Sequence, residues 1–283
     1  MNFLKSLFGR KEEDPEKKKV EEAARNFDVF KYDGVRALRS GQLPYAIECF
    51  NHALDIRDDL EVRDYLSQAL IRNNELLPAY EQLQKLHEAQ PDNLQVLHRM
   101  ADVTYMMEDY VTMADVCEKA LLLDKNDPET LFFYARACIG QDDRVNAIAM
   151  LTKAIAVKED FAEARLLRGQ TLLEMGDTES ASEDVDWLLQ HTKDSEDVLL
   201  LQAQVDTAKG DLQKAADVYT KVIELNPFSL QAFRERGAIR LKLGDKEGAE
   251  EDMKSVLELD PKATEQINGK FDNGATEPTT QPG

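Results

Sequence analysis

The sequence has few of the residues that build covalent or metal-based frameworks. It contains three cysteines, one tryptophan and four histidines in 283 residues. An odd and small number of cysteines excludes a disulfide framework and favours a reducing compartment, for which the cytoplasm is the expected location. No histidine has a second histidine, cysteine or carboxylate at the spacing of a ligand set such as H-x3-H or C-x2-C. We therefore expect no metal site and no cofactor.

Long apolar runs are missing as well. No stretch of 18 apolar residues occurs, and the N-terminal region has no apolar core followed by a small-residue cleavage site. The sequence therefore predicts neither a membrane span nor a secretory signal. It also has no G-x4-G-K-[ST] phosphate loop and no cluster of residues typical of nucleophilic or acid–base catalysis. We identify no catalytic residues and predict that the protein is not an enzyme.

Positive charge is scarce. Lysine and arginine number 35 against 55 aspartates and glutamates, which gives a formal net charge of −20. Nucleic-acid binding usually requires a basic stripe that replaces the counterions along the phosphates. This charge balance argues against a nucleic-acid partner. An acidic surface more simply keeps the protein in solution.

What the sequence does contain is a pattern with a period of 34 residues, shortened once to 33. One column of this pattern, the marker column, is alanine in six of seven places: Ala46, Ala79, Met113, Ala147, Ala181, Ala215 and Ala249. A second column, twelve residues earlier, is small in every repeat: Gly34, Ser67, Ala101, Ala135, Gly169, Ala203 and Gly237. A constant period in this range is typical of a stacked repeat array.

Each repeat is predicted to be a helical hairpin. The residues four and seven places after the marker are mostly apolar, and on a helix they share one face with it. A small residue twelve places earlier lets a second helix approach closely. Helix-breaking or capping residues separate the two halves of each repeat: Ser40-Gly41, Asn73-Asn74, Glu108-Asp109, Gln141-Asp142-Asp143, Gly176-Asp177, Gly210-Asp211 and Gly244-Asp245.

This pattern resembles the tetratricopeptide repeat family, whose unit reads roughly W-x2-L-G-x2-Y, then A-x3-F, then P. The segments GDLQKAADVYTKVIELNP and GDKEGAEEDMKSVLELDP, which end at Pro227 and Pro261, match best. The resemblance implies an all-α solenoid, a right-handed superhelix of antiparallel helix hairpins that acts as a noncatalytic protein–protein interaction module or scaffold. We expect an N-terminal segment at 1–26, a solenoid at 27–263 and a disordered tail at 264–283. The predicted repeats are 27–59, 60–93, 94–127, 128–161, 162–195, 196–229 and 230–263.

The resemblance also implies a concave groove, lined by fixed positions of each repeat, that binds an extended or helical segment of a protein or peptide partner. In the middle repeats these positions are largely apolar, and exposed apolar area of this kind marks contact surfaces. The alternative is that the adjacent helix covers several of these side chains. The predicted groove residues are Tyr105, Met106, Phe132, Arg136, Ile139, Leu166, Gln170, Leu173, Leu200 and Gln204.

The two ends of the chain suggest further hypotheses. Phe3, Leu4, Leu7 and Phe8 fall on one helical face next to basic residues, so this segment is a candidate membrane contact of a peripheral membrane adaptor. The alternative is a frayed end that caps the first repeat. Residues 17–26 are charged and helix-prone, and we expect them to lead into the first repeat. The last repeat has an unusually short cap, which favours either fraying or self-association as a homodimer through this repeat.

Overall fold

The computed structural model describes residues 15–192 and 195–262 of the chain. Over these residues the structure is all-α, with fourteen helices and no strand, as the sequence predicts. The helices are α1 (Pro15–Arg39), α2 (Leu43–Ile56), α3 (Leu60–Arg72), α4 (Leu76–Ala89), α5 (Leu94–Met106), α6 (Tyr110–Leu123), α7 (Pro128–Gly140), α8 (Arg144–Val157), α9 (Ala162–Glu174), α10 (Thr178–His191), α11 (Glu196–Lys209), α12 (Leu212–Leu225), α13 (Leu230–Leu243) and α14 (Lys246–Leu259).

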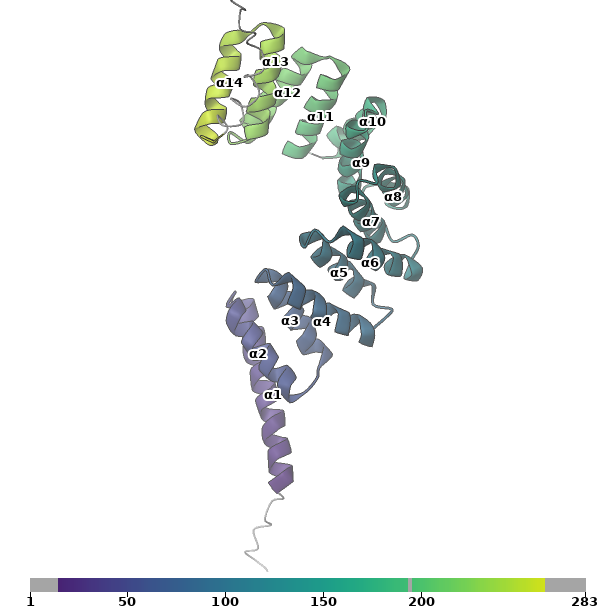
Figure 1. Cartoon of the computed structure of the whole chain (residues 1–283), viewed down its shortest axis with the longest axis vertical. Helices are drawn as coiled ribbons and strands as arrows, with labels where there is room; N and C mark the ends of the chain where they lie inside the picture. The colour runs from purple at the N-terminus through teal and green to yellow at the C-terminus, as the bar shows by residue number, and fades with distance from the viewer. Residues whose placement is uncertain (1–14, 193–194, 263–283) are drawn as a thin grey trace, which may run out of the picture. The chain divides into compact units, whose positions relative to one another are not determined.

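The chain divides into two compact units, Met1–Met150 and Leu151–Gly283, with the division inside α8. In the first unit, hairpins α1–α2, α3–α4 and α5–α6 follow one another, and each second helix also packs on the first helix of the next hairpin (Figure 1). In the second unit, hairpins α9–α10, α11–α12 and α13–α14 do the same (Figure 1). First helices of successive hairpins also touch, as α5 and α7 do in one unit and α9 and α11 in the other.

A left-handed residue closes each of the seven hairpin turns within the described ranges. Four of these residues are glycines with φ between 76° and 86°, and three are other residues with φ between 57° and 63°. All seven lie in one column of the repeat: Gly41, Asn74, Glu108, Asp142, Gly176, Gly210 and Gly244. Because a left-handed residue ends a helix and lets the chain reverse, this column sets the hairpin geometry. The turn positions predicted from sequence are therefore confirmed.

Aspartates begin several of the second helices. The side chain of Asp109 accepts a hydrogen bond from the backbone N–H of Thr112, and Asp177 and Asp245 do the same for Ser180 and Gly248. Each bond satisfies one of the N–H groups that the first turn of a helix leaves without a partner. In the pairs Gly176-Asp177 and Gly244-Asp245, the glycine thus ends one helix and the aspartate caps the next.

The small-residue columns lie where helices touch. The first six members of the marker column, Ala46 to Ala215, are 0% exposed. Twelve residues earlier, a Cβ atom on Gly34 or Gly169 would come within 3 Å of a side chain of a neighbouring helix. These close approaches explain why the column excludes large side chains, and they confirm the helix pairing predicted from the sequence.

Two ion pairs built on buried aspartates join helices of the second unit. Arg168 bonds both carboxylate oxygens of Asp184, at 2.8 and 2.6 Å, across hairpin α9–α10. Arg236 makes the same pair of bonds to Asp252 across α13–α14, at 3.0 and 2.5 Å. Each arginine also reaches a threonine of the preceding second helix, Thr152 or Thr220. The whole arrangement recurs after 68 residues, two repeats apart.

The first helix begins at Pro15, so residues 17–26 lead into the first repeat as expected. Phe3, Leu4, Leu7 and Phe8 lie outside the described residues, as does the tail from 264 onward. Among the described helices, none combines the length and the apolar character that crossing a bilayer requires.

Candidate functional site

The first half of the predicted groove forms an aromatic cluster around one arginine. The guanidinium carbon of Arg136 in α7 lies 3.4 Å from the ring centroid of Tyr105 in α5. It lies 5.7 Å from the ring of Phe132 and 5.9 Å from that of Phe133. A guanidinium over an aromatic face is attracted by the ring quadrupole. Three of the predicted groove residues therefore lie together, and the contact of Arg136 with Tyr105 joins α7 to α5.

The same surface is open to solvent. Met106 is 46% exposed, and Tyr105, Phe132 and Ile139 are half-buried. Asp102, one helical turn before Met106, lies 4.0 Å from Arg136 and is exposed. None of the five predicted groove residues of this unit is buried. The surface along α5 and α7, which we call the α5–α7 surface, therefore presents apolar and aromatic groups beside one cation.

The second half of the predicted groove lies in the other unit, on α9 and α11, and has a different character. Leu166, Leu173 and Leu200 are half-buried, as is Gln204, while Gln170 is exposed. The two helices pack against each other, so these residues occupy neighbouring first helices. This surface has leucines and amides where the α5–α7 surface has aromatic rings and a guanidinium.

Sequence reasoning missed a polar network at the start of α7. The Nε2 atom of His98 in α5 lies 2.9 Å from Asp127 and 2.9 Å from the hydroxyl of Thr130. Its Nδ1 atom lies 3.2 Å from the carboxylate of Glu129. Asp127 also accepts the backbone N–H of Thr130 and so caps α7. The partners come from 29 to 32 residues away, close to one repeat, so a search for short ligand spacings could not find them.

This network is not arranged as a metal centre. Among residues 15–192 and 195–262, no group of three histidine, cysteine or acidic side chains is placed to hold a metal ion. The His98 contacts join α5 to the start of α7, and aspartate, glutamate and threonine satisfy the imidazole nitrogens. One part of this network can be recognised in the sequence. Asp127 directly before Pro128 indicates the start of a helix, and therefore a capping side chain at this position.

The thiols are placed for packing. Cys49, Cys117 and Cys138 are all free and buried. Burial raises the pKa of the Cys117 thiol to about 12, and it also raises the pKa of Cys49 and of Cys138. Since the thiolate is the reactive form, these side chains remain protonated near neutral pH. They behave as the small hydrophobic residues that their places in the repeat predict.

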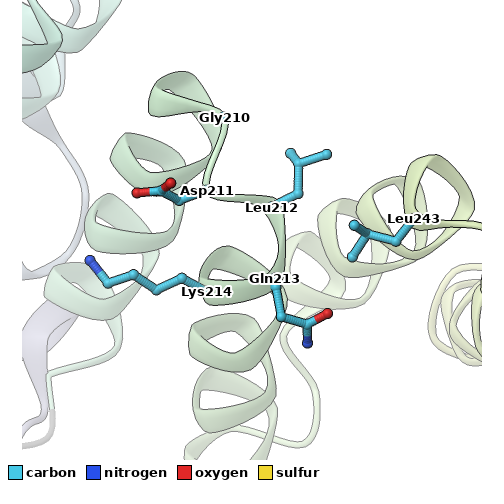
Figure 2. A pocket seen from close by; sticks show the side chains of 6 residues that line it. All are labelled: Gly210, Asp211, Leu212, Gln213, Lys214 and Leu243. Atoms are coloured by element: carbon cyan, nitrogen blue, oxygen red, sulfur yellow. The ribbon is translucent and has the colours of Figure 1, made fainter.

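A shallow hollow also lies in the second unit, away from the predicted groove residues. It is lined by Gly210, Asp211, Leu212, Gln213, Lys214 and Leu243. Figure 2 shows the Asp211 and Lys214 side chains on one side of the chain, with Leu212 and Gln213 toward the helix of Leu243. Lys214 also pairs with the buried Asp206 at 2.7 Å. The hollow lies beside a hairpin turn and gathers no set of groups suited to catalysis.

The fold and this surface define a class of protein, the α-solenoids built from tandem helical hairpins. Two family models described as tetratricopeptide repeat match residues 139–205 and 200–264. A human protein called tetratricopeptide repeat protein 16 is 26% identical over 236 residues, which cover 81% of this chain and 24% of that protein. Residues 139–264, which these two models match, therefore consist of tetratricopeptide repeats. The chain spans about a quarter of the length of the human relative.

Solved structures show the same fold. A tetratricopeptide repeat protein from Parabacteroides merdae superposes with a TM-score of 0.70 at 16% identity, covering 86% of this chain and 97% of that one. YrrB, described as a tetratricopeptide repeat protein with an unusual peptide-binding site, gives a TM-score of 0.55 at 15% identity, covering 66% and 97%. At these identities the likeness establishes the fold alone.

Proposed function

We propose that the protein is a noncatalytic scaffold whose α5–α7 surface binds a segment of a partner protein. The fold is that of protein-interaction scaffolds in general. The observation that carries the proposal is the stack of Arg136 on Tyr105, with the Phe132 ring near the same guanidinium. Met106, which follows Tyr105 in α5, is exposed. Aromatic residues, methionine and arginine are the side chains enriched in protein–protein contacts.

The chemistry of this surface indicates the kind of segment that fits. Tyr105, Phe132, Met106 and Ile139 offer apolar area for a bulky anchor residue of the partner. Methionine adapts its shape to such an anchor because its side chain is flexible and polarisable. Arg136 is held in place by the rings, so its remaining N–H groups can donate to a backbone carbonyl or a carboxylate of the bound segment. The peptide-binding site described for YrrB is consistent with this use of the fold.

The second unit extends the proposal to the leucine and glutamine side chains of α9 and α11. Leu166, Leu173 and Leu200 supply apolar area, and Gln170 and Gln204 supply amides that can bond an extended backbone. We propose that this surface binds a less aromatic part of a partner, or a second partner.

The test is affinity purification from cells followed by quantitative mass spectrometry, using four forms of the full chain. One is wild type, one carries Met106→Asp with Phe132→Asp, and one carries Phe132→Asp with Leu166→Asp. The control carries Val111→Asp in α6, a side chain that is 64% exposed and lies outside the predicted groove set. We expect partners captured by wild type and the control to be lost with both double variants. Equal capture by all four forms, with equal helicity by circular dichroism, would refute the proposal.

A second candidate rests on the sequence of the N-terminal segment. The apolar face formed by Phe3, Leu4, Leu7 and Phe8, with adjacent bases, suits an anionic bilayer surface, and we propose it as the membrane contact of a peripheral adaptor. Flotation with vesicles containing phosphatidylserine compares the full chain with a chain that starts at Asp14. Loss of flotation on truncation supports the contact, and equal flotation removes it. The three free thiols favour residence in the cytoplasm in either case.

A further inference from the structure

The last hairpin exposes a face that the other repeats cover. In the column four residues after the marker, six side chains are 0–3% exposed: Phe50, Leu83, Cys117, Leu151, Val185 and Tyr219. The seventh, Met253, is 37% exposed. The marker Ala249 is half-buried, unlike its six counterparts. Around these residues lies an apolar hollow of about 410 Å³ that also includes Leu241, which is 61% exposed.

The first helix, α1, exposes the complementary surface, the one by which a hairpin packs on the hairpin before it. In the column of Val29, the later repeats carry residues that are 0–4% exposed: Val62, Val96, Thr130, Ala164, Val198 and Ala232. Val29 itself is 49% exposed, and Tyr32 is 66% exposed. A hollow of about 400 Å³ lies on this end of hairpin α1–α2, lined by Asp33, Arg36 and Tyr45 among others. The exposed face of α1 thus corresponds to the face that, in the first helix of each later repeat, packs against the preceding hairpin.

Contacts inside the chain establish which columns meet across such an interface. Tyr134 in α7 donates to Glu118 in α6, and the equivalent residues pair again as Arg236 in α13 with Thr220 in α12. Seven residues after Tyr134, Gln141 donates to the backbone carbonyl of Tyr110, eight residues before Glu118. The two helices therefore run antiparallel in a fixed register. A step toward the C-terminus of the first helix therefore corresponds to a step of similar length toward the N-terminus of the second, seven residues against eight in this case.

Applied to the two ends of the chain, this register brings opposite charges together. Asp33 occupies the column of Tyr134 and Arg236, and Lys254 occupies the column of Glu118 and Thr220. Three residues after Asp33 comes Arg36, and four residues before Lys254 comes Glu250. Within one chain, Arg36 pairs with Asp33 and Lys254 pairs with Glu258. An α1 helix laid on α14 in this register would bring Asp33 near Lys254 and Arg36 near Glu250, so that these exposed pairs could exchange partners.

Arg36 and Glu250 are the charged members of otherwise uncharged columns. The column of Arg36 continues as Ala69, Val103, Ala137, Thr171, Val205 and Ile239, all 0–3% exposed. The column of Glu250 begins as Ile47, Tyr80, Ala114, Ile148, Ser182 and Ala216. Solvent exposure alone would explain a charge of either sign at each end. Opposite signs in two columns that face each other indicate a specific contact.

We propose that a second copy of the chain occupies the exposed face of α13–α14, docking its α1 helix there so that the repeat stack continues from one molecule into the next. The contact is heterologous, with different surfaces on the two partners, so it leaves one free end of each kind and can propagate. It buries Val29 and Tyr32 of one copy against Leu241 and Met253 of the other. This inference is independent of the partner surface on α5–α7.

Charge reversal tests the pairing. Sedimentation velocity of the full chain at low ionic strength, over a series of concentrations, compares wild type with Arg36→Glu, Glu250→Arg and the double variant. We expect the average mass of wild type to rise with concentration and each single variant to associate about tenfold more weakly, since like charges then meet. The double variant restores opposite charges and is expected to regain association.

Several outcomes would overturn the inference. A wild-type protein that stays monomeric at the highest concentration would refute it directly. A double variant no better than either single variant, with helicity equal to wild type, removes the specific pairing. A third outcome is that Glu250→Arg weakens self-association, Arg36→Glu has no effect, and the mass does not rise beyond that of a dimer. This result would assign the exposed face to a symmetric homodimer through the last repeat and would exclude the head-to-tail contact. A mixture of the two single variants that associates as wild type does supports the head-to-tail arrangement.

Discussion

Gly34 in α1 and Phe50 in α2 fit together without room for a further atom. A Cβ on Gly34 would lie 2.6 Å from Cε1 of Phe50, and Phe50 itself is 0% exposed. No real Cβ contact is that short. The ring therefore occupies the space that any other residue at position 34 would need.

Gly34→Leu is expected to destabilise the first hairpin. Overpacking of this kind typically costs about 1–3 kcal/mol, which exceeds the gain of about 1 kcal/mol from replacing glycine inside a helix. The matched control is Ala24→Leu, on an exposed stretch of the same helix. Thermal unfolding followed by circular dichroism measures both. A Gly34→Leu protein with the same unfolding temperature as the Ala24→Leu control would contradict the packing argument.

Glu108→Gly is expected to stabilise the protein. Glu108 has a φ of 57°, a left-handed conformation that costs energy for residues with a Cβ, whereas the equivalent turn residue is glycine in four other repeats. The left-handed conformation costs about 1–2 kcal/mol, and the greater backbone entropy that glycine loses on folding offsets about 0.5–1 kcal/mol of this, so a net gain below about 1.5 kcal/mol is expected. Asn74→Gly, in the same column at φ 61°, is expected to gain less because asparagine tolerates this conformation. Urea unfolding of both variants provides the comparison, and a destabilised Glu108→Gly protein would contradict it.

Asp252→Ala is expected to open the last hairpin. The Asp252 side chain is 2% exposed and accepts bonds from Arg236 and Arg240. Its loss leaves a buried guanidinium without a counterion, which typically costs about 3–5 kcal/mol. Hydrogen exchange should show faster amide exchange in α13 and α14. Glu258→Ala, which breaks an exposed pair with Lys254, serves as the control and should change little. Unchanged protection in Asp252→Ala would count against a structural role for the pair.

Cys117 is expected to make stability fall in alkali. Its pKa is raised by burial from an ordinary value of 9.0 to about 12. Between these values the unfolded thiol is ionised while the folded one keeps its proton, so the unfolded state binds fewer protons and stability decreases as pH rises. Denaturant unfolding from pH 8 to 11 should show a shallower decline for Cys117→Ala, by up to about 1.4 kcal/mol per pH unit. Identical slopes for the two proteins would contradict this.

Labelling with a maleimide gives a second measure of the same burial. At pH 8 the native protein should react slowly at Cys117, whereas the protein in denaturant should react fully, because only the exposed thiol ionises readily. Rapid labelling of the native protein at this position would show that α6 and α7 separate often.

Much of the fold follows from the sequence because close packing of helices restricts whole columns of residues. A small side chain is required at the position of Gly34 in every repeat, so the requirement is visible in the sequence as a period. The turns follow for the same reason, since a left-handed residue is needed at one fixed place. The buried ion pair between Arg236 and Asp252 could not be predicted in this way. Two charged residues 16 apart read as solvated surface until the helix pairing is known.

The groove remains a prediction as a binding site, and only the placement of its residues can be compared with the structure. The resemblance to the family placed Tyr105, Phe132 and Arg136 on one surface, and in the structure the Arg136 guanidinium lies over both rings. The stacking of the guanidinium on the Tyr105 ring depends on side-chain rotamers, which no spacing encodes. The contacts of His98 with Asp127 and Thr130 were missed because each joins different helices across almost a full repeat.

The Thr–Arg–Asp arrangement of the second unit makes the pair of repeats, and not the single repeat, its unit of duplication. Removal of residues 196–229 would leave Arg236 facing Asp186 in the column where Thr220 now stands. Removal of residues 162–229 would instead place Thr152 opposite Arg236. The Thr152 hydroxyl accepts a hydrogen bond from Arg168 in the present structure, so it could accept one from Arg236 in the same way. Shortening or lengthening this half of the protein by two repeats therefore preserves its buried electrostatics, while a change by one does not.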